Sequence, residues 1–305
     1  MMELRGNAAN YDAWGALGNP GWSFGEVLPY FIRSEDHERG ASEFHGAGGP
    51  IRVSGVRYKP AFSEAFVEAA VEAGLPRNDD FNGATQAGFG HYQVTQWNGR
   101  RCSTAVAYLN PVRARPNLTI VSHASTRRVM LDGARAVGVE YLHRGALKTA
   151  RATREVLLAA GAIGSPQLLM CSGIGPIDEL ESVGIRVRVP QTEVGRNLHD
   201  HVDYCTLQKC REPVTYDFGL LREAAEGLRY FLTQDGPGSS NIAEAGGFAR
   251  SSLARDGRAD LQFHFVPAQL DDHGRNRMSG HGYTLHACIL RPSSRGHIGL
   301  RSDST

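Results

Sequence analysis

The chain has 305 residues, and its 33 Lys and Arg against 32 Asp and Glu give a formal net charge of +1 at neutral pH. That balance provides no long-range field for nucleic acid or an acidic membrane surface, so we expect a small-molecule partner. The five cysteines form no CxxC pair and are odd in number, which favours reduced thiols over a closed disulfide framework. No apolar run is long enough to span a bilayer, and the opening residues lack the pattern of a signal peptide. We therefore expect a cytoplasmic protein with one large domain or two interleaved ones, and no integral membrane segment.

The first hundred residues predict a mixture of turns, helices and a strand, in keeping with the 36 glycines of a mixed α/β chain. Residues 1–45 are rich in turns and aromatic side chains, with a short helix expected around Glu26 to Ser34. The segment GGPIRVS alternates apolar and polar residues like an edge strand. The segment PAFSEAFVEAAVEAGLP then repeats apolar residues at helical spacing, and we expect this helix to stop at Gly74 and Pro76.

From Asn117 onward the pattern predicts mainly strands. LTIVSHAS, RRVMLDG and AVGVEYL each alternate, which indicates an antiparallel meander with a turn at Asp132 and Gly133. The continuous apolar run Val156–Ala160 is typical of a strand buried on both faces in a parallel sheet. Beyond residue 204 we expect a helix in LLREAAEGLRYFLTQ and two strands in ADLQFHFVP and GYTLHACILRP, with no closing element in GHIGLRSDST.

The stretch GAIGSPQLLMCSGIGP, residues 161–176, predicts a ligand-facing turn. We expect a tight turn at Gly161–Gly164, followed by a short helix. Ser165 would cap this helix, Pro166 would occupy its first turn, and the Ser-Gly pair after it would end it. A helix N-terminus directs unpaired N–H groups at a ligand, and glycines let that ligand approach the backbone, so an anion or a polar ring edge would suit it. The alternative is a β–α connection that binds nothing, because such turns are common.

The same stretch resembles the second signature of the glucose–methanol–choline (GMC) family of FAD-dependent oxidoreductases. Three further segments are similar to choline-dehydrogenase-like members of that family: RGNAANYDAWGALGNPGWSFGEVLPYFIRSED, NGRRCSTAVAYLNPVRARPNLTI and VGRNLHDHV. Together they cover nearly the whole chain. The resemblance implies an α/β fold in which part of an FAD-binding Rossmann-like domain is interleaved with a substrate domain made of an antiparallel sheet and helices.

The resemblance also implies a division of the chain and a longer parent protein. It assigns 1–45 to a flavin lid or extended FAD-domain segment, 46–100 to the substrate domain, 101–203 to the FAD-binding domain, and 204–305 to an incomplete second substrate-domain segment. The opening MMELRGN resembles the tail of the first family signature. The family's N-terminal GxGxxG and its C-terminal catalytic His pair have no counterpart here, so we expect a truncated form or fragment that lacks the catalytic residues and is poorly soluble.

The activity implied by the resemblance is oxidation of the CH–OH group of a small alcohol, in which hydride passes to FAD; the electron acceptor stays open. Two alternatives from other classes are a noncatalytic descendant that keeps the fold and a hydroxynitrile-lyase-like relative. An NAD-dependent dehydrogenase is disfavoured because the sequence contains no GxGxxG.

Only cofactor contacts can be transferred by position. The expected FAD-binding residues are Thr126, Gly161, Ala162, Ser165, Pro166, Asn197, Asp200 and His201. Thr126 stands where the family usually has a valine whose backbone faces the adenine, and a threonine keeps the same backbone N–H and C=O.

Other candidate ligands and nucleophiles have simpler interpretations. His199 with His201, and the stretch Asp271–Gly274, suggest a metal, but neither group has a third ligand at regular spacing, so we expect no metal there. His264 and His286 fit strand edges with backbone hydrogen bonds better than catalytic bases. Cys171 fits an inert apolar residue. Trp14 and Trp22 fit equally well as packing for a flavin lid and as anchors of their own loop.

Overall fold

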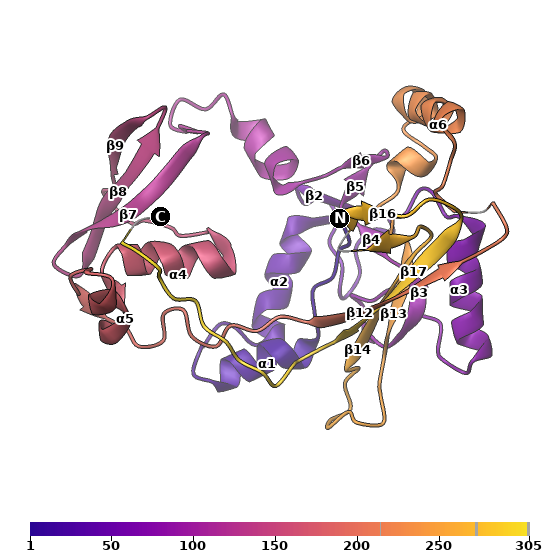
Figure 1. The fold of residues 1–305 in the computed structure, drawn as a ribbon, viewed down its shortest axis with the longest axis horizontal. Helices are drawn as coiled ribbons and strands as arrows, with labels where there is room; N and C mark the ends of the chain where they lie inside the picture. The colour runs from indigo at the N-terminus through magenta and orange to yellow at the C-terminus, as the bar shows by residue number, and fades with distance from the viewer. Residues whose placement is uncertain (214, 272–273, 304–305) are drawn as a thin grey trace. The chain divides into compact units, whose positions relative to one another are not determined.

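The computed structural model describes residues 1–213, 215–271 and 274–303. The chain divides into two compact units, each assembled from two separate stretches of sequence. Unit 1 comprises Met1–Arg115 and His201–Arg291, and unit 2 comprises Pro116–Asp200 and Pro292–Thr305. Helices and strands are mixed along the chain, which confirms the predicted α/β class (Figure 1).

An antiparallel five-stranded sheet is the framework of unit 1, with the strand order β12-β17-β14-β13-β3. Its strands are β3 (Gly88–His91), β12 (Val202–Lys209), β13 (Ala245–Ala249), β14 (Leu261–Val266) and β17 (Gly282–Ile289). The two strands predicted in ADLQFHFVP and GYTLHACILRP are confirmed as β14 and β17, and they pair with each other. Because β3 comes from the first stretch of the unit and the other four come from the second, the sheet joins both stretches.

Helix α3 (Ala61–Glu72) packs on one face of this sheet, as the helical spacing predicted. Val67 is fully buried against Ala245 and Phe265. The ring of Phe66 stacks on that of Phe265 with 4.8 Å between centroids. The helix gives way at Gly74, whose φ of +86° ends the helical path.

Smaller elements complete unit 1. They are α1 (Ala8–Ala16), α2 (Phe24–Ser34), α6 (Leu220–Thr233), β1 (Glu35–His37), β2 (Ile51–Gly55), β4 (Gln93–Val94), the hairpins β5 (Gln96–Trp97) with β6 (Arg100–Arg101) and β15 (Leu270–Asp271) with β16 (Asn276–Arg277), a single π-helical turn, Ala105–Leu109, and the short 3₁₀ helices Asn110–Val112 and Pro237–Ser239. The predicted helices α2 and α6 are confirmed. The prediction of an edge strand in GGPIRVS is wrong in one respect, because β2 lies between β1 and β4. None of the helices in the described residues combines the length and apolar character needed to cross a bilayer.

Unit 2 is built on a three-stranded antiparallel sheet, β7-β8-β9, with two helices beside it in the sequence. Its elements are β7 (Ala124–Asp132), β8 (Arg135–His143), β9 (Ala146–Arg151), α4 (Gly161–Cys171), β10 (Ile174–Gly175), α5 (Ile177–Ser182) and β11 (Val189–Pro190). The predicted β7–β8 hairpin is confirmed, but the third strand is ALKTAR and not the expected LTIVS. Arg144 and Gly145 both have positive φ, the geometry of a tight hairpin turn, so β9 folds back directly on β8.

The strand predicted at Val156–Ala160 is absent. These residues form no regular secondary structure, and 80% of the Leu157 surface is exposed. Burial on both faces requires a neighbouring strand on each side, and no strand within the described residues pairs with this segment. The apolar run therefore lies at the surface of unit 2.

Candidate functional site

Helix α4 begins earlier than the sequence predicts. Gly161–Gly164 form its first helical turn, not a separate tight turn, and the residue that precedes the helix is Ala160. Gly161 has a φ of +80°, so a single residue makes the bend and the helix follows at once. Ser165 therefore lies inside the helix, where its Oγ accepts a 3.1 Å hydrogen bond from the Ala160 N–H, and Pro166 lies in the second turn instead of the first.

The N-terminus of α4 is free to receive a ligand. No side chain caps it, and its first turn contains no acidic residue. A Cβ placed on Gly161 would meet no atom within 4 Å, so open space lies directly against the backbone. Pro166 has no N–H, so the Ala162 carbonyl cannot accept the usual helical bond from four residues on. The exposed amides and the positive end of the helix dipole suit an anionic or polar group.

A cavity of about 730 Å³ lies in unit 2 beside the beginning of α4, and one of the predicted contacts, Thr126, lines it. Thr126 of β7 lines it together with Ala160 and Gly164, at the beginning of α4. The Ser172 Oγ just after α4 accepts a 2.7 Å hydrogen bond from the Val129 N–H of β7, which fixes the helix beside the strand. The volume lies in the range of about 300–1,000 Å³ that small-molecule sites occupy.

The remaining predicted contacts lie elsewhere. Asn197, with a left-handed φ of +59°, lines a second hollow of unit 2 with Pro176 and Glu193. Asp200 is the last residue of the first stretch of unit 2, and His201 is the first residue of the second stretch of unit 1. Of the predicted contacts, the cavity thus includes Thr126. Gly161, Ala162, Ser165 and Pro166 lie next to its lining residues Ala160, Gly164 and Gln167 but do not line it themselves, and Asn197, Asp200 and His201 do not line it either.

The other candidate ligands, nucleophiles and lid residues lie in local environments that the structure describes. His199 Nδ1 lies 3.1 Å from the Asn197 carbonyl oxygen in its own loop. In the stretch Asp271–Gly274, positions 272 and 273 lie outside the described residues. Burial raises the pKa of the Cys171 thiol, which is consistent with an inert residue. The rings of Trp14 and Trp22 contact each other edge-on at 5.9 Å, which supports their interpretation as loop anchors.

The backbone-bonded interpretation of His264 and His286 is wrong. His286 Nδ1 lies 2.7 Å from Asp203 Oδ2, because the register places these two side chains on the same face of β12 and β17. His264 Nδ1 is buried and has no hydrogen-bond partner in the described part of the chain. Burial lowers the pKa of His264 to about 4, so the ring is neutral at physiological pH.

A buried ionic network in unit 1 was not anticipated from the sequence. Arg5 Nη2 lies 2.7 Å from Glu35 Oε2, and the His45 ring lies 3.0 Å from that same carboxylate and 2.9 Å from Asp80 Oδ2. Hydrogen bonds with Asp80 and Glu35 raise the pKa of His45 to about 9. Burial works to raise the pKa of Glu35, but the partners at His45, the Gly46 amide and Arg5 together hold it below its ordinary value. These residues are scattered along the chain, and no spacing in the sequence points to their contact.

The sequence comparisons decide the family. A family model described as GMC oxidoreductase matches residues 1–203, two thirds of the chain. The chain belongs to the GMC oxidoreductase family. It is 44% identical over 308 residues to the oxygen-dependent choline dehydrogenase of Paraburkholderia phymatum, covering 99% of this chain and 54% of that protein. It is 41% identical to the mitochondrial choline dehydrogenase of Mus musculus and 42% identical to an alcohol dehydrogenase [acceptor] of Pseudomonas putida, again over 99% of this chain and over 51% and 56% of those proteins.

Solved structures of GMC proteins share the fold. The crystal structure of pyridoxine 4-oxidase from Mesorbium loti matches 99% of this chain and 56% of its own with a TM-score of 0.84 and 30% identity. A formate oxidase from Aspergillus oryzae, studied for FAD modification, matches 99% of this chain and 59% of its own with a TM-score of 0.89 and 26% identity. The chain spans about half the length of the curated relatives it matches.

Proposed function

We propose that this chain is part of an FAD-dependent oxidoreductase that acts on the CH–OH group of a small alcohol such as choline. The observation that carries the proposal is identity of 41–44% to choline and alcohol dehydrogenases along 99% of the chain. At that level of identity the fold and the general chemistry are normally kept, whereas substrate preference depends on individual pocket side chains.

The residues at the beginning of α4 fit one polar part of FAD. Gly161 leaves open space against the backbone, and the unpaired amides of the first turn can donate to a phosphate or to a carbonyl of the flavin ring. Thr126 would present its backbone N–H and C=O to the adenine from the neighbouring cavity, which Ala160 and Gly164 also line. Asn197, Asp200 and His201 would line the flavin side. When bound, the flavin supplies the hydride acceptor, and the chain supplies orientation and exclusion of water.

The domain roles follow from the same proposal. Residues 101–203 would contribute to the FAD-binding domain, with 1–45 as its lid or extension. Residues 46–100 and 204–305 would contribute to the substrate domain. The five-stranded sheet of unit 1 supports the last assignment, because it combines a strand from each of these two segments.

A titration with FAD tests the proposal. We expect the purified chain to bind FAD, seen as a shifted and structured visible flavin spectrum with quenched fluorescence. Choline or a primary alcohol added without oxygen should then bleach the bound flavin if the chain also holds the reacting groups. A sample that binds no FAD under any refolding condition would refute the proposal. Tight binding without bleaching would be consistent with the expected lack of the family's His pair and would support the cofactor site alone.

A further inference from the structure

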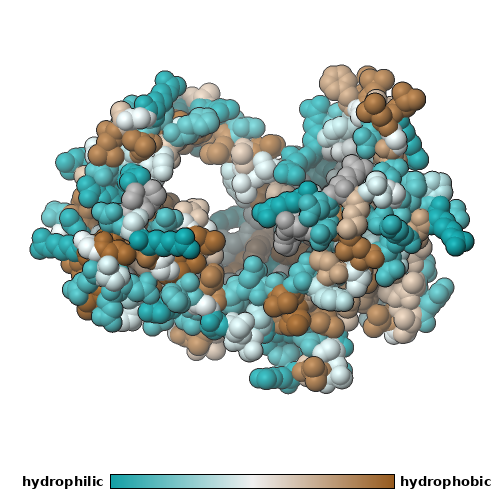
Figure 2. All heavy atoms as spheres, viewed as in Figure 1, coloured by the Kyte–Doolittle hydropathy of each residue, from teal (hydrophilic) through white to brown (hydrophobic). Residues whose placement is uncertain are grey.

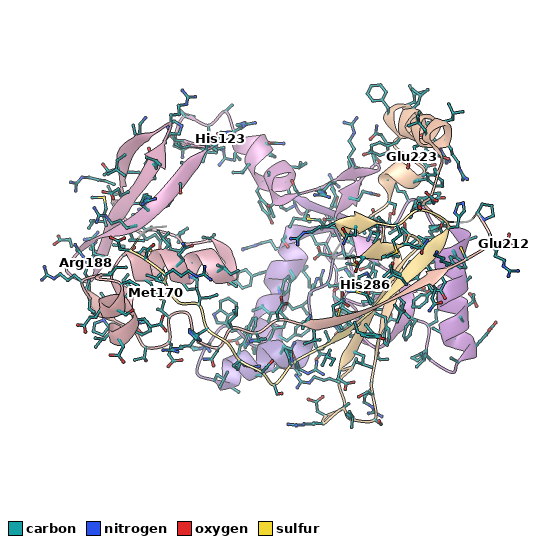
Figure 3. All side chains as sticks on the ribbon, in the orientation of Figure 1. His123, Met170, Arg188, Glu212, Glu223 and His286 are labelled. Carbon is teal, nitrogen blue, oxygen red and sulfur yellow. The ribbon has the colours of Figure 1, made fainter. Side chains whose placement is uncertain are left out.

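Four side chains of metal-binding type gather on one face of the five-stranded sheet in unit 1. Asp203 and Cys205 stand on β12, and His286 and Cys288 stand on β17. The register places Cys205 opposite His286 and Asp203 opposite Cys288, so all four side chains share one face. Phe265, which packs with Ala245 against α3, pairs with Leu285, the residue before His286. The side chains of Phe265 and His286 therefore lie on opposite faces of the sheet, and the cluster faces away from that helix. Figure 3 labels His286 on this sheet.

Three donor atoms of the cluster converge on one point. His286 Nδ1 lies 2.7 Å from Asp203 Oδ2 and 3.0 Å from Cys205 Sγ, and the Cys205 Sγ lies 3.4 Å from Asp203 Oδ2. The three atoms therefore form a compact triangle of one oxygen, one nitrogen and one sulfur. Such a mixed set is typical of zinc and of similar borderline metal ions.

The same geometry excludes a Cys-His-Asp nucleophile. In a catalytic triad the acid and the nucleophile contact different ring nitrogens, so that a proton passes across the imidazole. Here both Asp203 and Cys205 lie against Nδ1 of His286. Burial and the hydrogen bond to Asp203 also raise the pKa of the Cys205 thiol to about 11, the opposite of what an activated thiolate requires.

Cys288 orients one ligand of the cluster, and solvent reaches the cluster through its exposed side. The Cys288 thiol donates a 3.3 Å hydrogen bond to Asp203 Oδ1, which directs the other carboxylate oxygen, Oδ2, toward the cluster. Cys205 is exposed, and Asp203 and His286 are partly buried, so an ion can reach the triangle from solvent.

The other group with comparable spacing, Glu35 with His37 and His45, is less suited to a cation. The Arg5 guanidinium already lies 2.7 Å from the Glu35 carboxylate, and both ring nitrogens of His45 face carboxylates. A bound cation there would face Arg5 and a protonated His45 at close range.

We propose that Asp203, Cys205 and His286 form a binding site for a divalent transition-metal ion of the zinc type, with a fourth position open to water. Zinc lies about 2.3 Å from sulfur and about 2.0–2.2 Å from nitrogen or oxygen, so tetrahedral binding requires the three donor atoms to separate by less than about 1 Å each. On binding, the Cys205 thiol gives its proton to solvent, and the Nδ1 proton of His286 that faces Asp203 also leaves, with Nε2 carrying the proton of the neutral ring. The sulfur, nitrogen and oxygen then each donate a lone pair to the metal. The site needs no flavin and goes beyond the proposed oxidoreductase function.

Cobalt(II) added to the full chain after treatment with a chelator tests the site without any activity assay. We expect one cobalt per chain, a thiolate-to-cobalt charge-transfer band in the near ultraviolet, and visible d–d bands of four-coordinate intensity that zinc abolishes by displacement. Cys205→Ser should remove the charge-transfer band. His286→Asn should weaken cobalt binding by more than about 100-fold, because loss of a direct ligand exceeds the effect of an outer-shell partner.

Control variants separate this site from other sulfur and nitrogen donors. Cys210→Ser changes a cysteine that follows the same strand but bonds to the Glu212 carbonyl, and should leave the bands unchanged. Cys288→Ala should weaken binding about tenfold and keep the charge-transfer band. Each variant is checked for a native circular dichroism spectrum and melting curve. Absence of the thiolate band in the unmodified folded chain, or its persistence in Cys205→Ser, would overturn the proposal.

Discussion

Gly161 is the residue on which the candidate cofactor site depends most directly. Its φ of +80° disfavours any side chain, and the space beside it is open. Gly184, after α5, has nearly the same φ of +75° and equally open surroundings. The two glycines thus form a matched pair in which only one faces the proposed ligand.

We expect Gly161→Ala and Gly184→Ala to destabilise the fold by a similar amount, about 1–2 kcal/mol each, because alanine disfavours positive φ. Only Gly161→Ala should weaken FAD binding, by about tenfold or more, equivalent to about 1.4 kcal/mol. Isothermal calorimetry and chemical denaturation measure the two effects separately. Equal FAD affinity in both variants would place the cofactor away from the beginning of α4.

His45 makes the stability of unit 1 depend on pH. Its pKa in the folded state is about 9, above the ordinary 6.5, so its contribution is fully present below pH 6.5 and is lost as pH rises through 9. Glu35 and Asp80 have lowered pKa values, so their contribution is present above their ordinary values and is lost on acidification. We expect the free energy of unfolding to fall between pH 6.5 and pH 9, as measured by urea denaturation.

His45→Gln provides the control for that titration. Glutamine keeps a polar side chain but cannot gain a proton, so the variant should be less stable at pH 6 and should lose most of the decline toward pH 9. Removal of one member of a buried ion pair commonly lowers the free energy of unfolding by about 3–5 kcal/mol. We expect a loss at the lower end of this range, because Glu35 remains paired with Arg5 in the variant. An unchanged slope in the variant would assign the pH dependence to other groups.

At the scale of elements, the contact between α3 and the five-stranded sheet holds the core of unit 1. Phe265 of β14 packs against Phe62, Phe66 and Tyr283. We expect Phe265→Ala to lower the free energy of unfolding by about 3–5 kcal/mol, as a buried aromatic deletion does. Leu221→Ala on α6, where 88% of the leucine surface is exposed, should change it by less than about 0.5 kcal/mol. Denaturant midpoints compare the two, and a small effect of Phe265→Ala would mean that α3 is not docked as described.

The elements that the sequence predicts well are those whose signal is local. The spacing of Phe62, Phe66 and Val67 defines α3, and alternation defines β14 and β17, because each pattern reflects one buried face. Val156–Ala160 is different, since its burial depends on neighbouring strands that no local pattern can supply. The third strand of the β7–β8–β9 sheet follows from a hairpin turn at Arg144 and Gly145, although all of its own residues are exposed and show no buried face.

The candidate sites divide in the same way. The beginning of α4 could be found because its glycines and proline lie within one short stretch. The Asp203, Cys205 and His286 cluster could not, because Asp-x-Cys and His-x-Cys become neighbours only through the register of β12 on β17. The sequence does contain one signal for this cluster: in each of the two strands, two potential ligands are separated by a single residue and so lie on the same face.

At the scale of the whole molecule, exposed apolar side chains should govern behaviour in solution. Five large apolar residues of α6 are exposed on the helix surface: Leu220, Leu221, Leu228, Phe231 and Leu232. Figure 2 shows hydrophobic side chains gathered over α6 at the upper right. The segment Val156–Ala160, with which no strand of the described residues pairs, adds a second apolar surface, and both features favour association.

We expect the chain expressed alone to bind a hydrophobic dye strongly and to aggregate, measured by light scattering during concentration. Leu221→Lys with Leu228→Lys should reduce scattering from the α6 surface and leave stability nearly unchanged, because both side chains are exposed. A monodisperse sample with low dye binding would show that these surfaces are covered in solution.

The divided sequence of unit 1 has a consequence for biosynthesis. Strand β3 leaves the ribosome before the first stretch of unit 2, Pro116–Asp200, and its partner β13 follows only after that stretch. Until then, the edge of β3 that pairs with β13 has no partner strand. Pairing of β3 with β13 also requires closure of a very long loop, which is slow. A nascent chain stalled within unit 2 would therefore carry an unpaired strand, the form of the polypeptide on which chaperones act most.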